Sequence, residues 1–158
     1  MSSIEETKGI NAMLIVEVIG KPPEHLRETL ERIIKEIDGE KDVAVIGKKI
    51  NEAKPMEKQK EFYMNFAEIE VEVKDILNLV ILMFKYMPAH IEIISPEAIV
   101  LTNTGWNDIL NELTRRLHGY DEMARIVQVE KNILEKRLRE VLEGEVKEPE
   151  KKKAKKKK

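Results

Sequence analysis

The stretch EFYMNFAEIEVEV, residues 61–73, contains the alternation that decides the fold. Apolar residues recur there at every second position, as Ala67, Ile69, Val71 and Val73. The positions between them are held by Glu68, Glu70 and Glu72. Successive side chains of a strand point to opposite faces, so the pattern predicts a β-strand with one buried and one water-facing side. Phe62, Met64 and Phe66 follow the other phase, which predicts a β-bulge near Phe66.

Strands and helices are predicted on both sides of this stretch. Before it, residues 13–19 form an apolar strand, residues 23–38 have the apolar spacing of a helix, and residues 43–50 predict a second strand. Residues 51–60 are charged and contain Pro55, so we expect a long mobile hairpin loop. After the stretch, Asp75 can cap a helix over residues 76–87 that is apolar nearly all round, and residues 90–95 predict a fourth strand.

The order strand, helix, strand, strand, helix, strand is that of a ferredoxin-like α+β sandwich, which we assign to residues 13–104. Residues 1–12 are polar and aperiodic, and we expect them to be flexible. Residues 96–102 fit a short helix and a strand equally well, and both alternatives stay open. The order resembles many unrelated modules, among them RNA-recognition domains and small-molecule-sensing regulatory domains, so it does not by itself indicate a function.

A helical extension is predicted over residues 105–144. An apolar stripe runs from Trp106 to Leu117, His118-Gly119 predicts a C-terminal cap, and a longer helix follows from Asp121 to Gly144. The long stripe and the strongly apolar helix over residues 76–87 both need a cover, either within one chain or across a two-fold axis. We expect a homodimer, and the candidate dimer or helix-packing face is formed by Leu79, Met83, Ile126, Ile133, Leu134 and Leu138.

Charge is segregated along the chain. Residues 151–158 contain seven lysines, whereas 21 lysines and arginines against 30 aspartates and glutamates leave residues 1–150 at a net charge of −9. Such a run cannot bury apolar surface, so we expect residues 145–158 to be a disordered basic tail. The lysines attract polyanions, and the predicted nucleic-acid tether is formed by Lys151, Lys152, Lys153, Lys155, Lys156, Lys157 and Lys158. A solubilising tail without a fixed target is the alternative.

Motifs for catalysis and cofactor binding are absent from the sequence. It has no phosphate-binding glycine loop, no nucleophile elbow and no zinc-protease motif, so we expect neither catalytic residues nor a cofactor. A weak metal-site candidate combines His90 and Glu92, which share one face of a strand, with Glu17 of the neighbouring strand. The alternative for these residues, and for the glutamates of residues 68–72, is a solvated sheet face.

Four residues that follow the predicted sandwich or end it are candidate partner contacts: Asn103, Trp106, Arg115 and Arg116. An exposed tryptophan ring could anchor a protein or stack on a base. The position of Trp106 at the head of a stripe with Ile109 and Leu110 favours burial instead.

Composition restricts the classes further. The chain has no cysteine, which excludes a disulfide framework and thiolate chemistry and favours a reducing compartment. Its first residues lack a signal-peptide pattern, and its most apolar stretch, residues 76–87, is too short to span a membrane. We therefore expect a cytoplasmic protein without a membrane partner. The high content of Glu, Lys and Arg is typical of hyperthermophile proteins.

These observations predict a non-enzymatic, homodimeric binding protein. We expect it to associate with RNA or the ribosome as a translation-related factor, with the lysine tail as an electrostatic tether and a ribosomal or other protein as a further partner. The alternative is a small-molecule-sensing regulatory module with a ligand pocket at a dimer interface. A metal-dependent enzyme is the third candidate.

Overall fold

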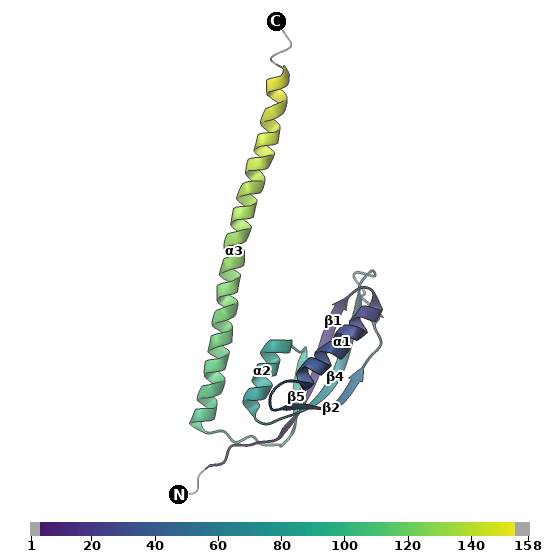
Figure 1. The fold of residues 1–158 in the computed structure, drawn as a ribbon, viewed down its shortest axis with the longest axis vertical. Coiled ribbons are helices and arrows are strands. Elements are labelled where there is room, and N and C mark those ends of the chain that lie inside the picture. Colours follow the sequence, from purple (N-terminus) through teal and green to yellow (C-terminus); the bar gives the residue numbers. More distant parts are fainter. Residues whose placement is uncertain (1–3, 154–158) are drawn as a thin grey trace. The chain divides into compact units, whose positions relative to one another are not determined.

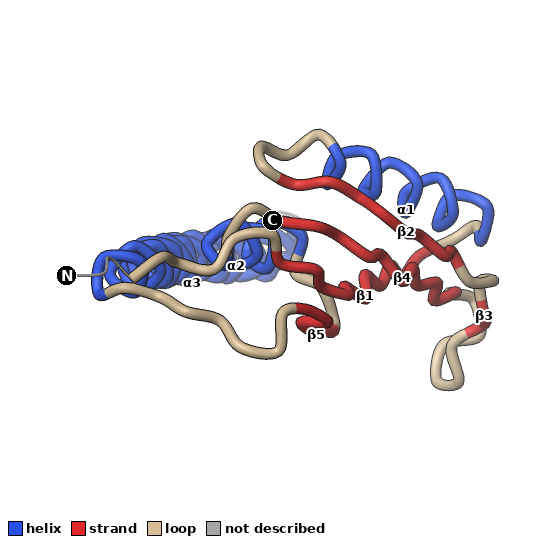
Figure 2. Tube along the Cα trace, turned by 90° about the horizontal axis from the view of Figure 1, so that it is seen from below, coloured by secondary structure: helices blue, strands red, loops and turns tan. Residues whose placement is uncertain are grey.

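The computed structural model describes the backbone of residues 4–153 and the side chains of residues 4–144. The elements follow in the order β1 (Ile10–Gly20), α1 (Pro23–Asp38), β2 (Val43–Ile50), β3 (Lys54–Pro55), β4 (Tyr63–Val73), α2 (Ile76–Tyr86), β5 (His90–Ser95) and α3 (Asn103–Lys153). Figures 1 and 2 show their course. The chain divides into two compact units, Met1–Leu113 and Thr114–Lys158, so that α3 begins in the first unit and makes up the described part of the second.

The first unit is an α+β structure built on a five-stranded antiparallel sheet. Its main strands lie in the order β2-β4-β1-β5, and the short β3 also pairs with β4. The predicted strands, the helix after β1 and the helix after β4 are therefore confirmed. The expected mobile loop over residues 51–60 is instead partly paired, because Lys54 and Pro55 lie opposite Met64 and Tyr63.

The predicted β-bulge near Phe66 is wrong. β4 pairs with β1 in unbroken register from Ile10↔Val73 to Gly20↔Tyr63. The irregularity lies in β2 instead, where the register shifts between Val45 and Gly47. The inner phase of β4 continues through Asn65, which is only 2% exposed and whose Oδ1 accepts a hydrogen bond from the Phe66 N–H at 2.8 Å. This polar residue interrupts the apolar alternation without interrupting the strand.

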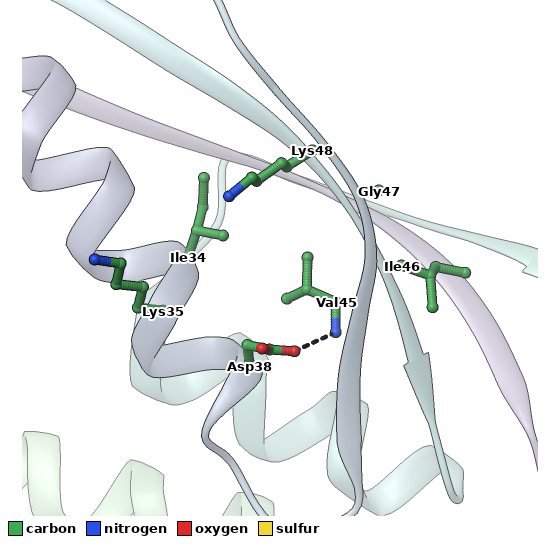
Figure 3. Close-up of a pocket in the computed structure, with 7 residues that line it drawn as sticks. All are labelled: Ile34, Lys35, Asp38, Val45, Ile46, Gly47 and Lys48. Atoms are coloured by element: carbon green, nitrogen blue, oxygen red, sulfur yellow. Dashed lines mark hydrogen bonds between the residues drawn. The ribbon is translucent and has the colours of Figure 1, made fainter.

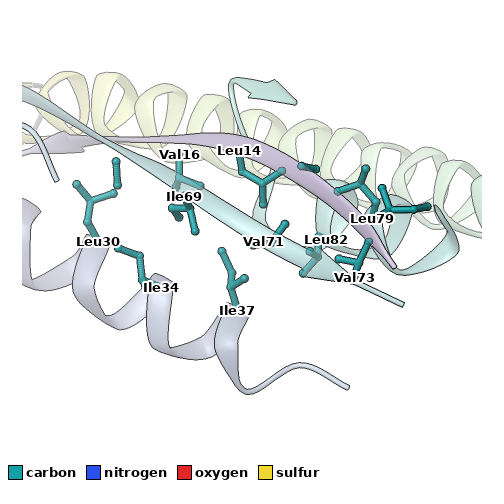
Figure 4. Packing of buried hydrophobic residues seen from close by; sticks show 13 residues of the cluster. Leu14, Val16, Leu30, Ile34, Ile37, Ile69, Val71, Val73, Leu79 and Leu82 are labelled. Carbon is teal, nitrogen blue, oxygen red and sulfur yellow. The ribbon is translucent and has the colours of Figure 1, made fainter. Parts of the chain in front are cut away.

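One hydrophobic core lies between the sheet and the two helices that follow β1 and β4 (Figure 4). Alternate residues of β1 and β4, including Leu14 and Ile69, meet Leu30, Ile34 and Ile37 of α1. Leu79 and Leu82 of α2 complete the cluster. As predicted, Asp75 caps α2, because its side chain accepts a hydrogen bond from Asn78 N while the Asn78 side chain accepts one from Asp75 N.

The N-terminal segment is more ordered than predicted. Residues 10–12 belong to β1, and Thr7 exchanges hydrogen bonds with Val100 through its backbone N–H and its hydroxyl. The Glu6 carboxylate accepts hydrogen bonds from the backbone N–H and the hydroxyl of Thr102. Residues 96–102 are neither helix nor strand. They form a connection that is held by the N-terminal segment and leads into α3.

The predicted pair of C-terminal helices is a single helix, α3. It passes through Gly119, where a cap was expected, and beyond Gly144, where the second helix was expected to end. An isolated glycine costs a helix interior only about 1 kcal/mol relative to alanine, which is too little to end a helix whose other residues favour it. α3 continues to Lys153 and so enters the segment predicted to be disordered, whereas residues 154–158 lie outside the described residues.

Candidate functional site

The second unit, taken by itself, presents an exposed apolar face within residues 114–144. Eleven large apolar side chains of residues 114–144 are exposed: Leu117, Tyr120, Met123, Ile126, Val127, Val129, Ile133, Leu134, Leu138, Val141 and Leu142. Leu117 is 60% exposed and Leu134 64%. A helix in water owes most of its stability to packing of its apolar face, so these residues form a candidate surface for packing.

Many of these side chains follow a heptad spacing. Steps of three and four residues alternate through the eight positions that we call the seam: Leu117, Tyr120, Ala124, Val127, Lys131, Leu134, Leu138 and Val141. This is the a/d pattern of a coiled coil, with Lys131 as its single charged member. A shallow groove lies along the seam, lined by Val127, Glu130, Lys131, Leu134, Glu135 and Leu138. A side chain of a second helix could enter this groove.

The six residues expected to form a dimer or helix-packing face belong to both units. Leu134 and Leu138 lie on the exposed seam, whereas Ile126 and Ile133 are exposed beside it. Leu79 is only 4% exposed and belongs to the core of the first unit, and Met83 is half-buried on α2. Leu79 therefore packs within the first unit, and whether the other residues of the expected dimer or helix-packing face meet a partner stays a prediction.

The weak metal candidate is not supported. Pairing of β1 with β5 places His90 opposite Ile15 and Glu92 opposite Met13, so Glu17 lies two residues beyond the position that His90 faces. The three residues share a face of the sheet, but within residues 4–144 no group of three or more His, Asp or Glu side chains could hold a metal ion. Glu68 and Glu70 are half-buried and Glu72 is exposed on that same face, and Lys49 lies 3.9 Å from Glu68.

A shallow hollow of about 360 Å³ lies between α1 and β2 (Figure 3). Ile34 and Val45 supply apolar walls, and Lys35 and Lys48 supply cationic groups. At one end the Asp38 carboxylate accepts a hydrogen bond from the Val45 N–H at 2.9 Å. This bond occupies a backbone donor of β2, which is an edge strand, and so protects part of that edge from pairing with another strand. The sequence did not indicate the hollow because it depends on how α1 lies against β2.

The candidate partner contacts are placed as follows. Trp106 is 53% exposed, so the expectation of burial is wrong, and its neighbour Leu110 is 54% exposed. The buried member of the first turns of α3 is Ile109. Asn103 is exposed at the start of α3, Arg115 is exposed, and Arg116 is half-buried. The lysine tether falls on residues whose side chains lie outside the described part of the chain.

Two carboxylates in the first unit, Glu40 and Glu6, have lowered pKa values and accept hydrogen bonds that join separate segments of the chain. Glu40, in the turn after α1, accepts hydrogen bonds from Lys85 and from the Tyr86 hydroxyl, the latter at 2.6 Å, and these bonds lower the pKa of Glu40. Burial and the Glu40 carboxylate raise the pKa of Tyr86. Hydrogen bonds from Thr102 lower the pKa of Glu6, which lies beside the first turn of α3. These contacts join elements of the first unit to one another.

Comparisons with known proteins place the chain in a family. Within residues 4–153, no helix has both the length and the apolar character needed to cross a bilayer. No curated protein and no solved structure matches the chain. The model of the MJ0538 family matches residues 11–153, which include β1 from its second residue onward and all of the other strands and helices. The chain therefore belongs to the MJ0538 family.

Proposed function

We propose that the protein is a non-enzymatic homodimer that associates with RNA or the ribosome, as a translation-related factor, through its lysine tail. The observation that carries this proposal is the segregation of charge, because residues 151–158 hold seven lysines while residues 1–150 carry a net charge of −9. An acidic body repels a phosphate backbone, so attraction to a polyanion has to come from the tail.

The exposed face of α3 supports the dimeric form of the proposal. A single tail binds weakly and without sequence preference, whereas two linked tails raise each other's effective concentration on one polyanion. The strand order β2-β4-β1-β5 with helices after β1 and β4 supports a ferredoxin-like arrangement of the first unit. That fold hosts many functions, so the proposal rests on the tail and not on the fold.

Tail deletion tests the proposal. A variant lacking residues 151–158 should lose co-sedimentation with ribosomes and with total RNA at low salt, while a variant carrying arginine at the seven lysine positions should keep it, because the tether depends on charge. Circular dichroism of both variants controls for folding. Undiminished co-sedimentation of the deleted variant would refute the role of the tail.

The hollow between α1 and β2 favours a second candidate, a small-molecule-sensing regulatory module. Its apolar walls and two lysines suit a small ligand that carries an acidic group. A ligand that binds only the native state raises the melting temperature, so a metabolite screen on the tailless protein should give a hit that Lys48→Ala weakens. A screen without any stabilising compound would count against this function, whatever the tail does.

A further inference from the structure

We infer that residues 117–141 of α3 form a parallel, in-register, two-stranded coiled coil with a second copy of this chain. The inference deepens the proposed function, since it takes the homodimer from it and assigns the interface, the orientation and the number of strands. It rests on the spacing of the seam, on its exposure and on the charges beside it.

The length of the seam suits a coiled coil. Its eight positions from Leu117 to Val141 cover more than three heptads, which is the range in which an a/d pattern becomes a reliable indication of a coiled coil. Seven of the eight side chains are apolar, and all of these except the small Ala124 are large apolar side chains that are exposed in the single chain. The groove of Val127, Glu130, Lys131 and Leu134 has the spacing i, i+3, i+4 and i+7. Four residues at this spacing form the hole that receives one side chain of a facing helix.

The number of strands follows from Lys131. In a two-stranded coil a lysine at an a position can lay its methylene stem across the seam and keep its ammonium group in water. In a bundle of three or four helices the same position is enclosed, and the charge would be desolvated. Lys131 Nζ already lies 3.8 Å from Glu135 Oε1 of its own chain, on the rim of the seam. A single charged residue at an a position also fixes register, at a cost in stability.

The orientation follows from a comparison of the two ways in which two copies of the seam can pair over its whole length, parallel and antiparallel. A parallel pair in register confines lysine to one layer, Lys131 against the partner's Lys131, and brings Arg116 beside the partner's Asp121. Glu130 and the partner's Glu135 are like charges there, but the two Lys131 side chains lie between them. An antiparallel pair centred on the same seam introduces lysine into two layers, each against Val127, and places Asp121 beside the partner's Glu135. The parallel pair therefore leaves more apolar layers intact.

Outside the seam, Ile126, Val129 and Ile133 form a smaller exposed apolar strip. In the heptad that the seam defines they occupy c and f positions, on the far side from the partner. These residues provide the internal control for the register. If they form the interface instead, the seam assignment fails.

The chain has no cysteine, so single cysteines report on the interface without background. In the full chain, Ala124→Cys and Val141→Cys should each form a disulfide between two copies under mild oxidation. Their Cα atoms would meet within disulfide range in a parallel coil. Val129→Cys is the matched control. At micromolar protein concentration, the effective concentration of one cysteine near its counterpart across an interface is about millimolar. The yield of covalent dimer from each seam variant should therefore exceed the yield from Val129→Cys by at least about tenfold.

Three results would overturn the inference. The first is a yield of covalent dimer from Ala124→Cys and Val141→Cys no higher than the yield from Val129→Cys. The second is a yield from Val129→Cys that exceeds both. The third is a mixture of the Tyr120→Cys and Leu138→Cys variants in which Tyr120→Cys cross-links only to Leu138→Cys. The last result would show an antiparallel pair. Deletion of residues 151–158 should leave the cross-link unchanged. Failure of the coiled coil is therefore distinguishable from failure of the RNA tether, which the same deletion tests by co-sedimentation.

Discussion

At the scale of single residues, two glycines of α3 show how little of their role the sequence reveals. A Cβ added at Gly105 would lie 2.5 Å from Glu6 Oε1 and 3.2 Å from Leu101 Cδ2, whereas one added at Gly119 meets nothing within 4 Å. The sequence suggested the reverse importance, because Gly119 follows His118 as a cap would and Gly105 closes a polar loop. A glycine is therefore favoured at residue 105 for steric reasons, because Glu6 of the N-terminal segment lies against the start of α3 there.

These glycines give the first prediction. Gly119→Ala should raise the free energy of unfolding by about 0.5–1 kcal/mol, because alanine is the better helix former and has room. Gly105→Ala should lower it, since overpacking typically costs about 1–3 kcal/mol, which exceeds the gain in helix propensity. Urea unfolding measures both. In a Glu6→Ala background the penalty at Gly105 should shrink, and an unchanged penalty would show that Glu6 is not the obstacle.

The second prediction concerns Glu40. Its pKa is lowered in the folded state by Lys85 and Tyr86, so its contribution to stability is present above the unfolded pKa near 4.5 and is lost as pH falls through the folded pKa. Glu40→Gln should therefore be less stable than the natural chain at pH 7, and the difference should close in acid. Thermal unfolding of both proteins from pH 7 down to acidic pH measures this difference in stability.

Tyr86→Phe serves as the comparison. It removes one hydrogen bond to Glu40 and leaves the Lys85 contact, so it should cost on the order of 1 kcal/mol at neutral pH and change the acid dependence less. A stability gap for Glu40→Gln that stays constant with pH would contradict the proposed role of the ionised carboxylate.

At the scale of elements, the strands were predictable because each is an apolar run or an alternation of apolar and polar residues. β2 and β5 have the predicted bounds and β4 lies within the predicted stretch, and the Asp75 cap is present. The position of the bulge was not predictable. A buried Asn65 has the sequence signature of a phase shift, and only the unbroken pairing of β4 with β1 shows that the strand continues. The apolar stripe of α3 was predicted, but a cap expected at Gly119 divided it between two helices. α3 is continuous through Gly119, so the spacing of three and four residues also runs through it.

The third prediction is at this scale and concerns Lys131. In the coiled coil proposed above, Lys131→Leu completes an apolar seam and removes two like charges from one layer, so the dimer should dissociate at lower concentration and melt at higher temperature. Sedimentation equilibrium and concentration-dependent melts measure the two effects. Lys136→Leu, at an outward position of the same helix, is the control and should leave dissociation unchanged. A weaker dimer for Lys131→Leu would show that Lys131 makes favourable contacts to the partner that the seam assignment omits.

At the scale of the whole molecule, the acidic body and the basic tail are assigned different tasks. The first unit supplies a packed sheet, the hydrogen-bonded carboxylates of Glu6 and Glu40, and a hollow between α1 and β2. The described part of the second unit is one helix with an exposed apolar seam. The sequence shows that the body is acidic and the tail basic, and their division of tasks stays a prediction. The sequence alone does not tell which apolar residues of α2 and α3 are buried: Leu79 lies in the core of the first unit, whereas Leu134 is exposed on the second.

The fourth prediction links the two proposals through salt. Each arm of seven lysines neutralises up to about seven phosphates, so the logarithm of the affinity for single-stranded RNA should fall with the logarithm of salt concentration with a slope of at most about −5 per arm. A parallel coil carries both arms at one end of the pair, so a dimer on one RNA should approach twice that slope. Fluorescence anisotropy with a labelled oligonucleotide measures it. Leu134→Lys, which places a second charge in the seam, should reduce the slope toward the single-arm value, and deletion of residues 151–158 should bring it near zero. If Leu134→Lys yields a folded monomer whose slope equals that of the natural chain, the two arms do not act together, and the dimer serves some purpose other than tethering.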